Sequence, residues 1–154
     1  GAPSHLDHRG LGAPHTLDQR CASGVRVGVL RALAPLVGGH LGPHLGHVLT
    51  AVAQCIEEQL RSLDRVGRNG GEEFVAVLPE CSALQARRIF DEIRVRFAAL
   101  TFNAGDHQEF RVTFSAGICE TDEHSAASVL LERADQALYL AKHQGRNQVQ
   151  VAER

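Results

Sequence analysis

The residues of this sequence best suited to phosphate chemistry are two glycines followed by two carboxylates. Gly70 and Gly71 precede Glu72 and Glu73, and Phe74 begins an apolar run. Glycine adopts positive φ readily and lets backbone amides come close to a phosphate. Carboxylates suit a Mg²⁺ ion that bridges to phosphates. A charged hairpin tip without a function is the alternative for so short a motif, so the motif alone leaves both interpretations open.

The bulk composition limits what kind of ligand these residues could serve. The chain has 154 residues, of which 44% are hydrophobic and 22% are charged, an ordinary balance for one globular domain with a core. The 18 acids exceed the 16 bases, giving a net charge of −2. This near balance argues against a broad surface for a nucleic-acid polymer. Phosphate binding would therefore depend on a few placed residues.

Cysteine spacing and hydropathy suggest the compartment. Cys21, Cys55, Cys81 and Cys119 form no CxxC pair, which argues against a zinc or redox motif and favours free thiols in a reducing cytoplasm. Residues 32–56 carry no Asp, Glu, Lys or Arg, but glycines and prolines interrupt them. A membrane-spanning helix needs about 20 predominantly apolar residues. We therefore expect a cytoplasmic domain that makes no membrane contact.

The elements that would position the motif begin with strands. Residues 1–16 are rich in His, Gly and Pro and are expected to form an irregular lead-in, while residues 17–154 are expected to form a single domain. The segments Arg65–Val66 and Phe74–Leu78, joined through the two glycines, predict a β-hairpin. Apolar and β-branched runs predict further strands at Val25–Leu33, Phe110–Ile118 and Gln148–Val151.

Helical spacing of apolar residues predicts the elements that would cover these strands. One helix is expected over Leu45–Leu60 and a second over Leu84–Leu100. A third is expected to begin at a Ser125 N-cap and to end at Gly145. Together the elements predict an α/β fold of the α+β type, in which helices flank a central mixed, mostly antiparallel β-sheet.

A second motif near the C-terminus makes the pattern specific. The hairpin reads RxGGEEF from Arg68, and residues 134–147 read ADxALYxAKxxGRN. Two motifs of this length and order resemble the GGDEF family of diguanylate cyclases, from about Leu45 to Val149. The resemblance implies a nucleotide-cyclase-like fold with a GGEEF β-hairpin. It also implies an enzyme that joins two GTP molecules into cyclic di-GMP, with each domain of a dimer presenting one GTP.

The resemblance assigns roles around the hairpin. It implies that Glu72 is a Mg²⁺ ligand and that Glu72 and Glu73 are catalytic. Arg68 would offset charge in the transition state, and Gly70 and Gly71 would lie against the phosphates. These roles agree with the physics of phosphoryl transfer, which depends mostly on positioning and on charge neutralisation.

In the C-terminal motif the resemblance implies that Lys142 and Arg146 hold the triphosphate. A helix C-terminus also favours cations without any ligand. Both explanations therefore stay open for these two residues.

The first half of the chain lacks the acids that the resemblance requires. Residues 19–56 contain no Asp or Glu. Our alignment places Val29 at the first metal aspartate of the family, and Val37 and Gly46 at its two guanine-reading positions. One Glu cannot readily replace a cage for two Mg²⁺ ions, and guanine would meet apolar side chains. We expect a degenerate GTP and metal site, with Mg²⁺ as a cofactor only if catalysis survives and no cofactor otherwise.

A second ligand site is predicted upstream of the glycines. Arg61 and Asp64 form an RxxD that resembles the inhibitory site at which the family binds its product, cyclic di-GMP. Arginine donates to the N7/O6 edge of guanine, and aspartate accepts from guanine N1–H and N2–H₂. The family often adds an arginine from the next helix, where our alignment has Glu92, so the alternatives are Arg88, Arg96 or an arginine supplied by a partner chain. Alternatively, Arg61 and Asp64 could simply pair with each other.

Three functional hypotheses follow. The first is a cyclic di-GMP-binding regulatory domain with weak or absent catalysis, and it is the one we favour. The second is an active diguanylate cyclase that uses GTP. The third is a dimerisation or scaffold domain without a ligand. The expected partners are cyclic di-GMP and a second copy, as a homodimer or a ligand-bridged dimer, with sensory or EAL domains outside this chain.

Overall fold

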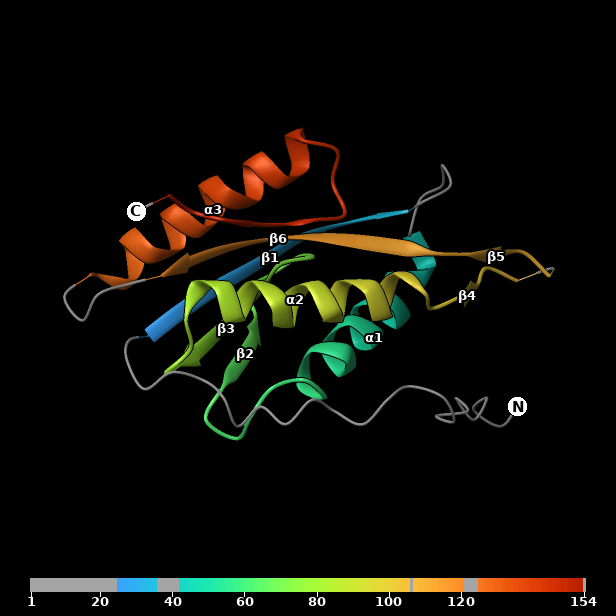
Figure 1. Ribbon diagram of the computed structural model, residues 1–154. Helices are drawn as coiled ribbons and strands as arrows, with labels where there is room; N and C mark the ends of the chain where they lie inside the picture. The colour runs from blue at the N-terminus through green and yellow to red at the C-terminus, as the bar shows by residue number, and fades with distance from the viewer. Residues whose placement is uncertain (1–24, 36–41, 106, 121–124, 154) are drawn as a thin grey trace.

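The computed structural model describes residues 25–35, 42–105, 107–120 and 125–153, and for residues 25–35 it describes the backbone (Figure 1). The predicted lead-in at residues 1–16, together with Cys21 and Val37, lies outside the described residues. The elements are β1 (Val25–Pro35), the 3₁₀ helix η2 (Gly42–His44), α1 (Leu45–Glu57), β2 (Arg65–Arg68), β3 (Phe74–Pro79), α2 (Ala83–Ala98), β4 (Phe102–Asn103), β5 (Glu109–Phe110), β6 (Val112–Glu120), α3 (Ala127–His143) and β7 (Val149–Val151).

The main sheet has the strand order β2-β3-β1-β6-β7. Neighbouring strands are antiparallel except for β6 and β7, which are parallel. This confirms the expected mixed, mostly antiparallel sheet. The small sheet of β4 and β5 was not predicted, because strands of two residues carry no readable alternation. Phe110 belongs to β5, so the strand expected from Phe110 begins at Val112 instead.

Helices cover both faces of the sheet. Figure 1 shows α1 and α2 on one face and α3 on the other. Strand β3 alternates accordingly, because Phe74, Ala76 and Leu78 are buried in the larger core with α1 and α2. Val75 and Val77, on the other side of the strand, pack against the α3 core. The period of two in the strand therefore divides the apolar residues between two layers.

Helix α3 lies very close to the sheet at Gly117 of β6. A Cβ atom at this position would lie 2.1 Å from the Ala134 carbonyl oxygen and 2.4 Å from the Leu138 nitrogen. A side chain of any size would therefore push α3 away from the strand. Glycine at this position sets the separation between the helix and the sheet.

The helix boundaries correct two details of the sequence prediction and confirm a third. Helix α1 ends at Glu57 rather than Leu60, because the chain turns at Glu58 and Gln59. The predicted Ser125 cap of α3 is wrong, since Ala126 takes the extended N-cap conformation and makes no side-chain cap bond. Ser125 therefore lies one residue too early to serve as the N-cap. Gly145 follows the end of α3 with φ of 117°, as predicted for a glycine that ends a helix.

Candidate functional site

The two glycines form the turn between β2 and β3. The Asn69 N–H donates to the Glu73 carbonyl oxygen at 2.8 Å, and the Glu73 N–H donates to the Gly70 carbonyl oxygen at 3.0 Å. Gly70 has φ of 90° and Gly71 has φ of 51°. These angles explain why glycine occupies both positions. The predicted hairpin with Gly-Gly in its turn is confirmed.

The two carboxylates of the turn point to different environments. Glu72 is exposed, while Glu73 is only 8% exposed. The Asn69 side-chain amide donates to Glu73 Oε1 at 3.0 Å. One acid is therefore held inward by a neighbour, and the other faces solvent.

Arg68 contributes to the shape of the turn. Its Nε donates to the Gly71 carbonyl oxygen at 2.8 Å, and the residue is exposed. In this arrangement the guanidinium braces the turn at its surface. Because Arg68 is exposed, a ligand at the surface would meet its positive charge at the tip of the hairpin.

The strand beside the hairpin brings no carboxylate to the turn. Strand β1 lies beside β3, with Val29 paired with Val75, and the sequence of β1 contains no carboxylate. Among the residues that the structure describes, no group of three or more His, Cys, Asp or Glu could hold a metal ion. Glu72 is thus left as a single outward carboxylate, and Mg²⁺ normally takes carboxylates together with water and phosphate oxygens.

The sheet brings the C-terminal motif to the same end as this turn. Phe74 pairs with Leu30, and Leu30 pairs with Ala116. Ala116 pairs in turn with Val149. Because β3 and β7 run in the same direction, the residues before Phe74 and before Val149 lie toward the same end of the sheet. Three inter-strand spacings, or about 14 Å, separate the two strand starts.

Lys142 and Arg146 lie at this end of the sheet. Lys142 is half-buried in the last turn of α3, and Arg146 is exposed in the turn that follows. The Arg146 N–H donates to the Ala141 carbonyl oxygen at 2.9 Å, which is the long bond of a Schellman C-cap. The predicted phosphate-binding residues and the hairpin turn therefore lie at the same end of the sheet.

Arg61 and Asp64 lie at the opposite end of β3. Arg61 Nη2 donates to Asp64 Oδ1 at 3.2 Å, and the Arg61 N–H donates to Asp64 Oδ2 at 2.8 Å. Arg61 Nη2 also donates to the carbonyl oxygen of Pro79. The Asp64 side chain is 0% exposed and that of Arg61 is 19% exposed. The two residues thus pair with each other, which was the alternative to guanine binding.

The guanidinium of Arg61 is incompletely satisfied in this pair. Its Nε atom is buried and has no hydrogen-bond partner within the described part of the chain. Arg88, which was predicted to support this site, is exposed on α2. A buried donor without an acceptor destabilises a structure by about 1–3 kcal/mol.

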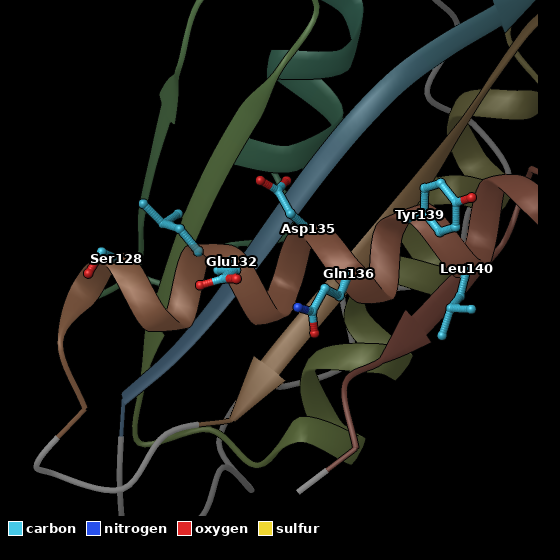
Figure 2. Close-up of a pocket in the computed structure, with 7 residues that line it drawn as sticks. Ser128, Glu132, Asp135, Gln136, Tyr139 and Leu140 are labelled. Atoms are coloured by element: carbon cyan, nitrogen blue, oxygen red, sulfur yellow. The ribbon is translucent and has the colours of Figure 1, made fainter.

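A groove along α3 was not predicted from the sequence. Figure 2 shows the side chains that line it, which come from successive turns of α3 and surround a volume of about 780 Å³. Tyr139 and Leu140 are exposed there, and Tyr139 stacks on His143 with ring centroids 3.8 Å apart. Tyr139 and Leu140 fall outside the apolar face that the sequence predicts for this helix, and this was the available signal. The lining residues are Ser128, Leu131, Glu132, Asp135, Gln136, Tyr139 and Leu140.

The described cysteines are free thiols. Cys81 and Cys119 are buried, and Cys55 is partly buried. Burial, with a smaller contribution from Glu58 that Arg96 opposes, raises the pKa of Cys55 to about 11. Burial also raises the pKa of Cys119. No helix in the described ranges is long and apolar enough to span a membrane.

Comparisons with known proteins agree with this geometry. The family model described as "Diguanylate cyclase, GGDEF domain" matches residues 40–148. Diguanylate cyclase DgcP of Pseudomonas aeruginosa is 39% identical over 114 residues, which cover 74% of this chain and 16% of DgcP. Diguanylate cyclase DosC of Escherichia coli is 35% identical over 104 residues, which cover 68% of this chain and 23% of DosC. The chain thus spans less than a quarter of the length of these relatives.

Solved structures show the same fold. The GGDEF domain of DgcB from Caulobacter crescentus, crystallised with cyclic di-GMP, superposes with a TM-score of 0.73 at 28% identity, covering 86% of this chain and 77% of that one. The GGEEF domain of a diguanylate cyclase from Vibrio cholerae gives a TM-score of 0.69 at 24% identity, covering 85% of each chain. With the family model matching residues 40–148, these results show that the chain belongs to the GGDEF family.

Proposed function

We propose that this domain serves cyclic di-GMP signalling as a binding domain whose cyclase activity is weak or absent. The relatives named above are diguanylate cyclases, and the DgcB domain was crystallised with cyclic di-GMP. The observation that carries the proposal is the contrast between the two ends of the sheet. One end retains a single outward carboxylate, whereas the other holds a guanidinium with an unused donor.

Arg61 is the residue that we assign to ligand binding. In the structure its Nε lacks an acceptor, so the closed pair with Asp64 is less stable than a fully bonded one. This lowers the free energy needed to turn Arg61 toward a ligand. The N7/O6 edge of guanine offers two acceptors with the spacing that a guanidinium matches. Guanine binding would therefore satisfy donors that the free protein leaves unpaired.

Asp64 takes a role that differs from the one expected from the sequence. Its side chain is fully covered and accepts the Arg61 N–H at 2.8 Å. We infer that Asp64 orients Arg61 in the free protein and reaches guanine N1–H only after the Arg61 side chain has moved. Arg88 on α2 is the proposed second cation of the site.

We expect weak catalysis because few carboxylates are available to bind Mg²⁺ near the hairpin turn. Glu72 is exposed, Glu73 is held by Asn69, and the segment 19–56 contributes no acid. A single carboxylate gives too little negative charge to gather two Mg²⁺ ions around a triphosphate. Lys142 and Arg146 remain at the same end of the sheet as the hairpin turn, and we propose that they still bind phosphate groups.

The alternative of an active cyclase has one observation in its favour. The hairpin is fully formed, with Glu72 exposed and with Lys142 and Arg146 at the same end of the sheet. Incubation with GTP and Mg²⁺, followed by chromatography for cyclic di-GMP, decides between the two functions. We expect little or no product, and robust turnover would overturn the degenerate-site proposal.

Calorimetric titration with cyclic di-GMP tests the binding site. We expect Arg61→Ala to weaken binding more than about tenfold, because a bidentate contact to guanine contributes about 1–3 kcal/mol. Arg87→Ala is the matched control, since it removes one charge from an exposed position on α2. Normal binding by Arg61→Ala, combined with weak binding by Glu72→Ala or Arg146→Ala, would move the ligand to the other end of the sheet. No heat with the wild-type chain would favour a scaffold domain without a ligand.

A further inference from the structure

The turn after α3 holds three consecutive residues with left-handed backbone angles. Gly145, Arg146 and Asn147 have φ of 117°, 63° and 45°. Glycine adopts such angles freely, but each non-glycine residue held there costs about 1–3 kcal/mol. A conformation of this kind persists only where surrounding contacts fix it. The contacts of this turn therefore identify the residues that maintain it.

One of these contacts comes from another helix. Arg94 of α2 donates from Nη1 to Asn147 Oδ1 at 2.9 Å, across 53 positions of sequence. Arg94 Nε donates to Asp91 Oδ1 at 2.8 Å, and the Arg94 side chain is 18% exposed. The Arg94 guanidinium is thus held by Asp91 of its own helix through Nε, and it contacts the turn after α3 through Nη1. The bonds that Arg146 N–H and the Gln148 side chain make to the turn are local to the end of α3.

The position of this turn gives the contact a functional meaning. The turn ends a helix, whose C-terminus carries a partial negative charge that repels anions. A phosphate can bind at such an end only where cationic side chains are placed accurately enough to outweigh that repulsion. Arg146 is exposed there, one turn after Lys142. Small displacements of Arg146 would therefore weaken phosphate binding strongly.

We propose that Arg94, through Asn147, is a positioning residue that holds Arg146 for the phosphate groups of a nucleotide. The inference rests on one part of the proposed function, namely that Lys142 and Arg146 bind phosphate. It depends neither on a metal ion nor on the binding of cyclic di-GMP at Arg61. The ligand class is a polyphosphate chain, recognised by its charge and without reading of the base.

Two variants remove the contact in different ways. Arg94→Met keeps the aliphatic stem and removes the donor. Asn147→Gly removes the acceptor and adopts φ of 45° without strain, so it folds even where Arg94→Met does not. Arg87→Met is the matched control, because it removes one positive charge from an exposed position on the same helix.

The measurement is the affinity for inorganic tripolyphosphate by calorimetry, with EDTA present to exclude metal bridging. We expect Arg94→Met and Asn147→Gly each to weaken binding about tenfold, which corresponds to about 1.4 kcal/mol. Arg87→Met should change it less than about twofold. Adding Arg94→Met to Arg146→Ala should cause no further loss, because Arg94 acts through Arg146.

Hydrogen exchange of the Arg146 amide separates positioning from a structural role. We expect faster exchange in Arg94→Met, since this amide bonds to the Ala141 carbonyl oxygen in the held turn. Faster exchange with unchanged tripolyphosphate affinity would overturn the proposal, as would additive losses in the double variant. Absence of tripolyphosphate binding by the wild-type chain would also overturn it. Cyclic di-GMP binding that still depends on Arg61 would then leave the proposed function standing.

Discussion

The side-chain amide of Asn69 lies 3.0 Å from the carboxylate of Glu73, across the turn that both residues close. The same two residues share a backbone bond of 2.8 Å. Asn69 therefore helps to hold Glu73 inward. Glu73 becomes part of the fold, and Glu72 alone remains as an outward carboxylate.

Removing this amide should loosen the hairpin. We expect Asn69→Ala to lower the free energy of unfolding by about 1–2 kcal/mol, because a buried carboxylate loses one of its donors. Urea denaturation followed by circular dichroism measures the change. Glu72→Gln is the control, since Glu72 is exposed and should leave the midpoint unchanged. An Asn69→Ala midpoint equal to that of the wild type would show that other contacts fix Glu73.

The close approach of α3 to β6 makes Gly117 intolerant of any side chain. A Cβ atom there would lie 2.1 Å from a backbone oxygen of α3, and backbone cannot move aside cheaply. We expect Gly117→Ala to destabilise the domain by about 3 kcal/mol, at the upper end for overpacking. Gly67→Ala is the matched control, because Gly67 also lies in a strand but has no atom within 4 Å of the added carbon. Equal thermal midpoints for the two variants would contradict the close contact.

The start of α2 depends on a capping box. The Ser82 hydroxyl accepts from the Gln85 N–H at 3.1 Å, and the Gln85 side chain accepts from the Ser82 N–H at 3.0 Å. We expect Ser82→Ala to cost about 1 kcal/mol of stability. Ser128→Ala, at an exposed position in the first turn of α3, should cost much less. If thermal melting shows the same loss for both, the capping box does not set the stability of α2.

Much of the fold could be predicted because its signals are local. The Gly-Gly pair requires positive φ, and the structure places both glycines in a turn between β2 and β3. Apolar spacing located α1, α2 and α3 to within a few residues. The errors have equally local causes. Ser125 carried the right side chain for a cap one residue too early, and β4 and β5 are too short to show alternation.

The site was less predictable because it depends on contacts between distant segments. No sequence signal indicated that Arg94 would meet Asn147, 53 positions away. The RxxD motif predicted that Arg61 and Asp64 would be close, but it could not show that Asp64 would be fully covered. Whether a polar side chain is used within the fold or left for a ligand is decided by packing, which a single motif does not encode.

Cys55 should react slowly with thiol reagents. Burial, followed by Glu58, raises its pKa from 9.0 to about 11, so at pH 8 the thiolate fraction is about a hundredfold smaller than that of an unperturbed thiol. Iodoacetamide labelling followed by peptide mass spectrometry should show this lag relative to a free cysteine peptide. Labelling of Cys55 should rise about tenfold per pH unit and level off only above about pH 11.

The same shift links Cys55 to stability at high pH. Because the folded-state pKa lies above the unfolded value, the neutral thiol favours the folded state below about pH 9, and this contribution is lost as the pH rises toward 11. Cys55→Ala should therefore flatten the decline in stability between pH 9 and 11, measured by urea denaturation at each pH. A wild-type curve with the same slope as the variant would show that the thiol is not desolvated in the folded protein. Rapid labelling at pH 8 would lead to the same conclusion, because only an accessible thiolate alkylates at that rate.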